Sequence, residues 1–329
     1  MLIQRRQFVV GSLGAAASLL ATPQQAFAAG YPDRPITFIC PWPVGGTADM
    51  TMRVLCQAAA GQLGQTLVVE NRAGASGMLG LKALASAKPD GYTIGQIPIS
   101  VTRFSQLGTV QIDPMKDLAY IARTSGQTFG IAVRADAPWQ TLKDFVTAAK
   151  ASPGKLTYGS SGTGGATHVG MEEFALAAGG IQLNHIPYKG GAPALQDLLG
   201  GQIDALADSS SWAPHVKSGK LRLLATWGEK RTRDFPEVPT LREQGYDVVV
   251  DAPNGIGAPK GLEPAIARRL REAFKAAAAS PEFAAACDRI DAPLMYLDAP
   301  DYEKYIAAAY KKETVLIERL KLKELMAKG

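Results

Sequence analysis

The sequence predicts an α/β fold with parallel strands. From residue 36 onward, short apolar runs alternate with longer segments of helical periodicity, and turns that contain Gly or Pro separate them. Of the 329 residues, 47% are hydrophobic and 20% are charged, which is the composition of a globular protein. A chain of this length can form about two domains of ordinary size. We therefore expect a folded protein with a substantial core.

Strand, turn and helix follow one another in the first third of the chain. Asp49 is a residue type that favours helix N-termini, and Gly64 is one that ends helices. Pro89 to Gly91 is typical of a turn before a strand. The expected elements are a strand at 36–40, a turn at 41–46, a helix at 49–63, a strand at 66–69, a helix at 77–87 and a strand at 92–97.

The same order continues through the rest of the chain. Thr141 and Asp144 have the spacing of a capping box, which opens a helix. A charged amphipathic pattern near the C-terminus predicts a last helix that packs on the fold. The expected elements are strands at 156–158, 182–186, 203–207 and 221–226, and helices at 165–178 and 302–325.

The chain has no internal repeat and no long Pro- or Gly-rich linker. This favours either one large domain or two lobes between which the backbone crosses more than once. The crossings are expected near 121–133 and near Trp227. Residues 30–127 together with 228–329 would then form one lobe, and residues 128–227 the other.

The N-terminus has the three parts of a secretory signal peptide. Arg5 and Arg6 precede an uncharged apolar stretch, and Ala26 to Ala28 is an A-x-A cleavage site. Residues 1–28 are thus predicted to be removed, and the mature chain to begin at Ala29. The paired arginines also fit a twin-arginine signal, and the two export routes stay open. No later apolar run is long enough to span a membrane, so the mature protein is expected to be soluble.

The charge balance argues against a nucleic-acid partner. The net charge of +5 comes from 35 basic and 30 acidic residues, with no Lys- or Arg-rich run. The three cysteines, Cys40, Cys56 and Cys287, have no metal-ligand spacing and cannot all pair with one another. We expect buried free thiols, with neither a disulfide framework nor a zinc site.

Cofactor-dependent and catalytic motifs are largely missing. There is no P-loop, and the glycines at 74–80 do not directly follow the predicted strand, as a dinucleotide fingerprint should. The histidines, His168, His185 and His215, lack metal-binding spacing, and no Gly-x-Ser-x-Gly elbow occurs. Ser161 near His168 fits anion binding better than nucleophilic catalysis. We expect no cofactor, no metal and no enzymatic activity.

Three glycine-rich turns precede helices, at 41–49, 71–77 and 159–168. Glycine lets the backbone turn its N–H groups toward a ligand, and a helix N-terminus attracts anions. A single turn of this kind often only closes an α/β connection. Several of them together predict a site for a small carboxylate.

The same segments resemble the Bug family, the extracytoplasmic solute receptors of tripartite tricarboxylate transporters. The resemblance spans nearly the whole mature chain. It rests on Tyr31-Pro32 with Arg34-Pro35-Ile36, Pro41-x-Pro43-x-Gly45-Gly46-x-x-Asp49 with Arg53, Val69 to Gly77, Pro89 to Thr93, Gly159 to Gly162 with His168, His185 to Ala194, Asp197 to Asp204 and Pro236 to Thr240.

The resemblance implies a periplasmic-binding-protein fold, in which two α/β lobes hold a ligand in the cleft between them. Asp49 could instead cap its own helix, and Trp42 could serve only in packing. The ligand-binding residues that the resemblance implies are Trp42, Val44, Gly45, Gly46, Asp49, Ser161, Gly162, Thr163, Thr167, His168, Asp208 and Ser209.

The implied function is capture of a small organic carboxylate in the periplasm for membrane transporter subunits. Partnership with a sensor kinase is the main alternative, and an exported enzyme is a weaker one; a monomer is expected. Two departures from the family pattern, Trp42 in place of a frequent Phe and the stretch 251–255 in place of one with an aromatic residue, prevent transfer of a particular ligand.

Overall fold

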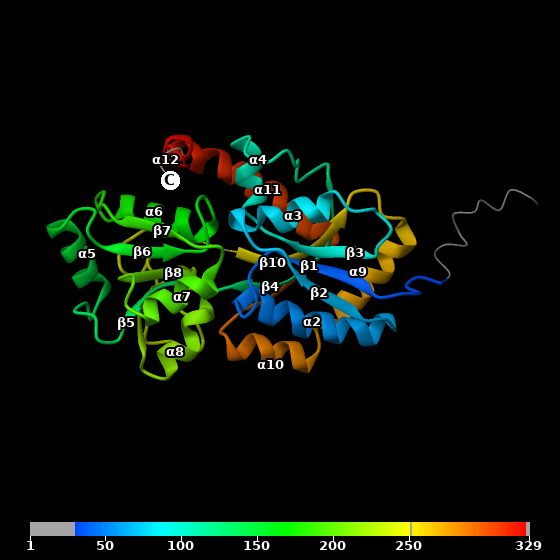
Figure 1. Cartoon of the computed structure of the whole chain (residues 1–329), viewed down its shortest axis with the longest axis horizontal. Helices are drawn as coiled ribbons and strands as arrows, with labels where there is room; N and C mark the ends of the chain where they lie inside the picture. Colours follow the sequence, from blue (N-terminus) through cyan, green and yellow to red (C-terminus); the bar gives the residue numbers. More distant parts are fainter. Residues whose placement is uncertain (1–29, 251, 327–329) are drawn as a thin grey trace, which may run out of the picture.

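The computed structural model describes residues 30–250 and 252–326. The predicted signal peptide, residues 1–28, lies outside the described residues. The strands form two sheets that lie side by side along the long axis, each covered by helices (Figure 1). We call the sheet that begins with β1, together with its helices, the first lobe, and the other sheet with its helices the second lobe. The predicted two-lobed α/β fold is confirmed.

Within the described residues, the first sheet has the strand order β11-β4-β10-β3-β1-β2. β1 pairs in parallel with β2 and β3, whereas β10 and β11 run antiparallel to their neighbours. These strands are β1 (Ile36–Cys40), β2 (Leu67–Asn71), β3 (Thr93–Ile97), β4 (Leu118–Gln127), β10 (Ala252–Pro259) and β11 (Leu294–Asp298).

Helices cover both faces of the first sheet. Phe38 and Ile39 are adjacent on β1, and their side chains belong to two different buried clusters, one on each face. On one face lie α2 (Thr47–Leu63), α9 (Pro264–Ala278) and α10 (Pro281–Arg289). On the other lie α3 (Met78–Ala85), α4 (Val101–Gln106) and α11 (Ala299–Arg319).

The second sheet has the order β7-β6-β8-β5-β9 in the described part of the chain. β6 pairs in parallel with β7 and β8, and β5 runs antiparallel to β8 and β9. Its strands are β5 (Phe129–Arg134), β6 (Thr157–Ser160), β7 (Asn184–Pro187), β8 (Ala205–Ser209) and β9 (Leu221–Thr226). Its helices are α5 (Leu142–Ala151) and α6 (Ala166–Ala177) on one face, and α7 (Gly191–Leu199) and α8 (Ala213–Lys217) on the other.

Two local sequence signals predict helix ends correctly. Gly64 ends α2 in a left-handed conformation, and the capping box of Thr141 and Asp144 opens α5. Two expectations need correction. α2 begins at Thr47 rather than at Asp49. The predicted helix at 302–325 is divided, because Lys321 has a positive φ between α11 and α12 (Leu322–Met326).

The backbone crosses between the lobes at two adjacent places. Thr128 alone separates β4 from β5, and the segment from β9 to β10 returns to the first lobe. The two crossings lie side by side, since Gln127 is the register partner of Ala252. Sequence analysis assigned residues 228–329 to the first lobe. Part of that range is misplaced, because Phe235 and Leu241 are buried in the core of the second lobe.

The C-terminal helices provide a third connection. Leu316 of α11 and Leu322 of α12 are buried together with Val169 of α6 in the second lobe. Arg319 also forms an ion pair with Glu173 of α6. In Figure 1, α11 begins over the first lobe and α12 lies above the second. α11 and α12 thus connect the two lobes in addition to the crossings.

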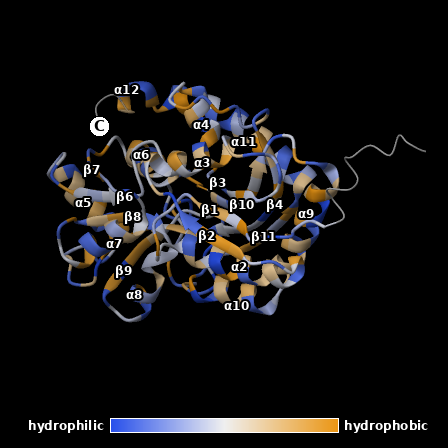
Figure 2. Cartoon of the chain, turned by 45° about the vertical axis from the view of Figure 1, so that its right-hand side comes forward, coloured by the Kyte–Doolittle hydropathy of each residue, from blue (hydrophilic) through white to orange (hydrophobic). Residues whose placement is uncertain are grey.

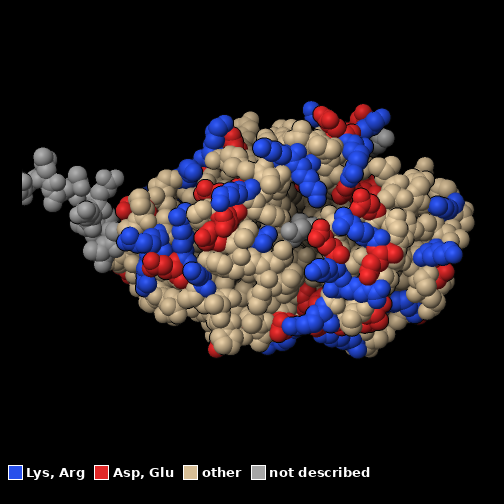
Figure 3. Space-filling model, turned by 180° about the vertical axis from the view of Figure 1, so that it is seen from behind, with Lys and Arg blue, Asp and Glu red and all other residues tan. Residues whose placement is uncertain are grey.

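The sequence pattern of apolar and charged residues is reflected in the surface. Figure 2 shows apolar strands inside the lobes and hydrophilic segments outside. On the face in Figure 3, basic and acidic side chains are interspersed. The three cysteines are buried free thiols, as expected. In the ranges 30–250 and 252–326, no helix has the length and apolarity needed to cross a membrane.

Candidate functional site

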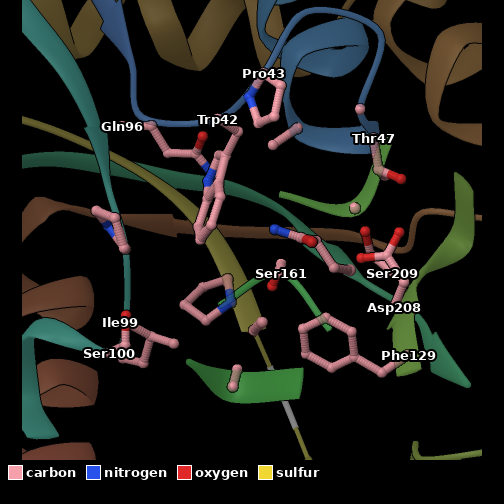
Figure 4. Close-up of a pocket in the computed structure, with 18 residues that line it drawn as sticks. Trp42, Pro43, Thr47, Gln96, Ile99, Ser100, Phe129, Ser161, Asp208 and Ser209 are labelled. Carbon is pink, nitrogen blue, oxygen red and sulfur yellow. The ribbon is translucent and has the colours of Figure 1, made fainter. Parts of the chain in front are cut away.

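A cavity lies between the lobes, beside the two crossings (Figure 4). The turn after β1, the end of β3 and the ends of β6 and β8 meet there, as expected for ligand sites at the carboxyl ends of parallel strands. The lining residues are Trp42, Pro43, Gly46, Thr47, Ala48, Gln96, Pro98, Ile99, Ser100, Gln127, Phe129, Ser161, Ala166, Gly191, Asp208, Ser209, Ala252 and Pro253.

The cavity suits a small ligand. Its volume is about 50 Å³. One water molecule needs roughly 10–15 Å³ on the same measure, so the space corresponds to a few waters or a compact organic molecule. The described residues that line it include no Lys, Arg or His. Any anion bound there is held by hydrogen-bond donors rather than by a cationic side chain.

The turn after β1 is held by Asp49. Its carboxylate accepts hydrogen bonds from the Gly45 amide (3.0 Å), Asn71 Nδ2 (2.7 Å) and Arg53 Nε (3.0 Å). Burial opposes ionisation, but the bonds from Arg53, Asn71 and Gly45 together lower the pKa of Asp49 below its usual value. Asp49 therefore stabilises the turn from within the first turn of α2, whose cap is Gly46.

The same turn leaves donors open toward the cavity. Gly46 caps α2 without a side-chain hydrogen bond, so the first N–H groups of this helix have no side-chain partner from the cap. Thr47 is 2% exposed, and its hydroxyl has no hydrogen-bond partner among the described residues. The indole nitrogen of Trp42 is likewise buried without a partner in the described chain. Buried donors without partners are costly, which points to a ligand.

The glycine-rich turn of the second lobe is built in a similar way. The Thr167 hydroxyl accepts from the Ser161 amide (3.1 Å) and pairs with the Ser161 hydroxyl (2.8 Å). The Gly164 amide donates to Nδ1 of His168 (2.9 Å). α6 then begins after Gly165, which offers no side-chain cap. Thr167 and His168 lie behind the turn and position it, and Ser161 reaches the cavity.

His168 belongs to a buried stack behind this turn. Its ring lies 3.9 Å from that of His185, which pairs with the Ser160 hydroxyl (2.7 Å). Burial, with smaller effects from His185 and Arg103, lowers the pKa of His168 to about 3. His168 is therefore neutral, and its Nδ1 is an acceptor for the Gly164 amide.

Asp208 ends β8 as a buried carboxylate. It is 3% exposed and accepts from the Ser211 hydroxyl at 2.5 Å. Burial raises its pKa to about 6, although hydrogen bonds from Ser211 and Ser209 act in the opposite direction. A Cβ at position 191 would overlap this carboxylate, so only glycine fits at the start of α7. Asp208 and Ser209 lie near Thr47 in Figure 4, away from Gln96.

An amide network at the other end of the cavity was not predicted. Asn254 Nδ2 donates to the Ser125 hydroxyl (3.0 Å) and to the Gly126 carbonyl (3.4 Å). Its oxygen therefore accepts from the side-chain amides of Gln96 (2.8 Å) and Gln127 (3.0 Å). Asn254 lies in the stretch 251–255 that departs from the family pattern, and a polar residue in each buried strand is the only sequence signal for this network.

The lobes are in contact around the cavity. The Ser76 hydroxyl in the first lobe donates to the Thr163 carbonyl in the second (2.8 Å). Arg103 of α4 donates to the Gly164 carbonyl (2.8 Å) and forms a buried two-bond ion pair with Glu313 of α11. The structure thus has its cleft closed over the cavity.

The predicted site residues fall into two groups. Those that line the cavity are Trp42, Gly46, Ser161, Asp208 and Ser209. Val44 is 66% exposed to solvent and does not line the cavity. The remaining ones, Gly45, Asp49, Gly162, Thr163, Thr167 and His168, lie in or behind the two turns and outside the lining.

Comparison with known proteins gives related chains along nearly the full length. Residues 51–322 match the family model described as "Tripartite tricarboxylate transporter family receptor". A Cupriavidus necator protein, described as "UPF0065 protein in gbd 5'region", is 43% identical over 324 residues, which are 97% of this chain and 99% of that protein.

Two solved structures have the same overall arrangement. The periplasmic binding protein BugD superposes with a TM-score of 0.83 at 29% identity, covering 89% of this chain and 99% of its own. The R. palustris protein Rpa4515, solved with adipate, also has a TM-score of 0.83, at 26% identity over 88% of this chain and 98% of its own.

Proposed function

The chain belongs to the tripartite tricarboxylate transporter receptor family and has the fold of periplasmic solute-binding proteins, and we propose that it captures a small organic carboxylate in the cavity between its lobes. The adipate in Rpa4515 supports a carboxylate as the ligand class. The family and the fold are those of binding proteins rather than of enzymes.

The main observation is that three helices begin at the same cavity. Gly46, Thr47 and Ala48 form the start of α2, Ala166 is the first residue of α6, and Gly191 is the first of α7. Each helix N-terminus stabilises an anion by about 0.3–1 kcal/mol, and by up to about 2 kcal/mol when partly buried. Several ends that converge can hold a carboxylate without Arg or Lys.

Hydroxyl and indole groups supply further donors. Thr47 and Trp42 each have a buried donor without a partner in the described chain, and the Ser161 hydroxyl lines the cavity from the second lobe. We assign the ligand contacts to Trp42, Gly46, Thr47 and Ser161. The residues behind the turns position these groups.

We further propose that the protein acts in the periplasm after cleavage of residues 1–28, as a monomer that delivers its ligand to transporter subunits in the membrane. The contacts across the cleft imply that binding is coupled to hinge closure, since they form only when the lobes approach. This role is tested by cross-linking the loaded receptor in intact cells and identifying the membrane partner. Transporter subunits would support transport, and a sensor kinase would support signalling.

Binding itself is tested by isothermal titration calorimetry. The receptor is freed of bound ligand by unfolding and refolding, and is then titrated with dicarboxylates, tricarboxylates, amino acids and aromatic acids. We expect binding of at least one carboxylate. If refolded, well-folded receptor binds none of them, the proposed function is wrong.

The site is tested by Gly46→Asp. A Cβ at Gly46 meets only the Pro43 carbonyl at 3.5 Å, so the substitution fits. The new carboxylate would cap α2 and occupy the place of the ligand, and affinity should fall by about ten-fold or more while stability is kept. Gly61→Asp puts the same charge at the exposed far end of α2 and should leave affinity unchanged. Unchanged affinity in Gly46→Asp would place the ligand elsewhere.

A further inference from the structure

Asp208 is a negative charge in a cavity proposed to bind an anion. It lines the cavity, is 3% exposed, and no described Lys, Arg or His lines the same space. No cation contributes to its pKa, which burial raises to about 6. A buried carboxylate without a cation is unfavourable, and it also repels a bound anion.

The local fold does not require this charge. The Ser211 hydroxyl donates to Oδ2 of Asp208, and Ser209 adds hydrogen bonds from its N–H and its hydroxyl; together they fix the turn after β8. An asparagine oxygen would accept the bond from Ser211. A carboxylate has about four acceptor positions, so Asp208 can still accept a further donor. A ligand that enters the cavity is the remaining source of such donors.

The opposite end of the cavity has a second unused acceptor. Because Asn254 Nδ2 donates to the Gly126 carbonyl, its oxygen must accept from Gln96 Nε2. This fixes the orientation of the Gln96 amide, and leaves its Oε1 buried without a partner in the described chain. The cavity thus presents acceptors, which an ionised dicarboxylate without further groups cannot satisfy.

We propose that the ligand is an amino acid, whose ammonium group binds the carboxylate of Asp208 and whose carboxylate binds at the starts of α2 and α6. This inference rests on the proposed function and narrows its ligand class. The ammonium group supplies three N–H donors and the positive charge that Asp208 lacks. Asp208 is then the residue that selects amino acids over acids without an amino group.

The first test uses the wild-type receptor and ligand pairs that differ only in the amino group. Butanedioate is compared with 2-aminobutanedioate, pentanedioate with 2-aminopentanedioate, and acids with polar and apolar side chains with their 2-amino forms. We expect the amino member of the binding pair to bind about ten-fold or more tightly. Equal or tighter binding of the acid without the amino group would overturn this inference and leave the proposed function standing. If none of these compounds binds, both this inference and the proposed function are wrong.

The second test is Asp208→Asn, which keeps the size and the acceptor for Ser211. We expect a loss of about ten-fold or more in affinity for the amino acid, with unchanged or higher affinity for its amino-free counterpart. Asp197→Asn is the matched control, since Asp197 accepts from the Tyr188 hydroxyl and is not among the residues that line the cavity. An equal loss for both ligands would show a purely structural role and overturn the inference. If Asp208→Asn does not fold, the comparison of the ligand pairs on the wild-type receptor tests the inference.

Discussion

Ser76 of the first lobe donates a hydrogen bond of 2.8 Å to the carbonyl of Thr163 in the second lobe. Both residues lie in glycine-rich turns, so the bond joins the two walls of the cleft directly. A net contribution of about 1 kcal/mol to closure is typical of such a bond.

Ser76→Ala should therefore weaken ligand binding by about five-fold, mainly through faster release. Ser86→Ala, an exposed position at the C-terminus of α3, the helix that follows the Ser76 turn, is the control and should bind as wild type. Affinity and dissociation rate are measured by calorimetry and stopped-flow fluorescence. Wild-type release from Ser76→Ala would mean that closure does not depend on this bond.

Thr47→Val should separate binding from stability. The Thr47 hydroxyl is buried without a partner in the described chain, so valine removes no protein hydrogen bond. We expect an unchanged or slightly higher free energy of unfolding, and an affinity lower by about five-fold or more.

Thr226→Val is a matched control for this change. Its hydroxyl is also buried without a described partner, but Thr226 is not among the residues that line the cavity. It should keep wild-type affinity in the same titration. A loss of stability without a loss of affinity in Thr47→Val would contradict the assignment of Thr47 as a ligand contact.

Arg103 and Glu313 should show strong coupling in a double-mutant cycle. Their side chains are 5% and 13% exposed, and each single substitution leaves the other charge buried. Arg103→Met or Glu313→Leu alone should cost about 3–5 kcal/mol, and the double variant clearly less than the sum. Urea unfolding measures all four proteins. Additive losses would mean that the pair contributes no coupling.

The pH dependence of stability should depend on His168. Its pKa is lowered from 6.5 to about 3 in the folded protein, so the unfolded state takes up a proton first as the pH falls. Between about pH 7.5 and 5, this residue should reduce the free energy of unfolding by about 2 kcal/mol. His185, with its pKa lowered to about 4 by burial, acts in the same direction.

The contribution of His168 is the difference between the pH dependence of stability of the wild type and that of His168→Gln. His168→Gln offers an oxygen to the Gly164 amide and cannot be protonated, so its stability should fall less with decreasing pH. His215→Gln, at a more accessible histidine, should keep most of the wild-type slope. Equal slopes for His168→Gln and wild type would show that His168 is not buried in a neutral form.

The sequence was sufficient to predict the elements that local chemistry determines. Gly64 marks the end of α2, and the capping box of Thr141 and Asp144 marks the start of α5. β10 was missed because its residues, Ala-Pro-Asn-Gly-Ile-Gly-Ala-Pro, are typical of a turn. All eight are buried between β3 and β4, and Gly255 leaves room for the Tyr302 ring. Only the packing of distant segments makes this stretch a central strand.

Part of the cavity lining could also be predicted from the sequence. Trp42, Gly46 and Ser161 lie in turns whose glycines are visible in the sequence, and the family resemblance added Asp208 and Ser209. Gln96 and Asn254 are 158 positions apart, and nothing local relates them. The resemblance also included Thr167 and His168, which lie outside the lining of the cavity and position the turn that contains Ser161.

The late position of β10 in the chain bears on how the protein is made. The strands of the second lobe are all synthesised before residue 227, and Phe235, Leu241 and Val248 complete its core, so it is able to fold once the chain up to that point is free. The first lobe has to wait for residues 252–259, because its early strands have no partner at the centre of the sheet until then. Assembly of the receptor is therefore expected to proceed from the middle of the chain outward, and the ligand cleft is completed last.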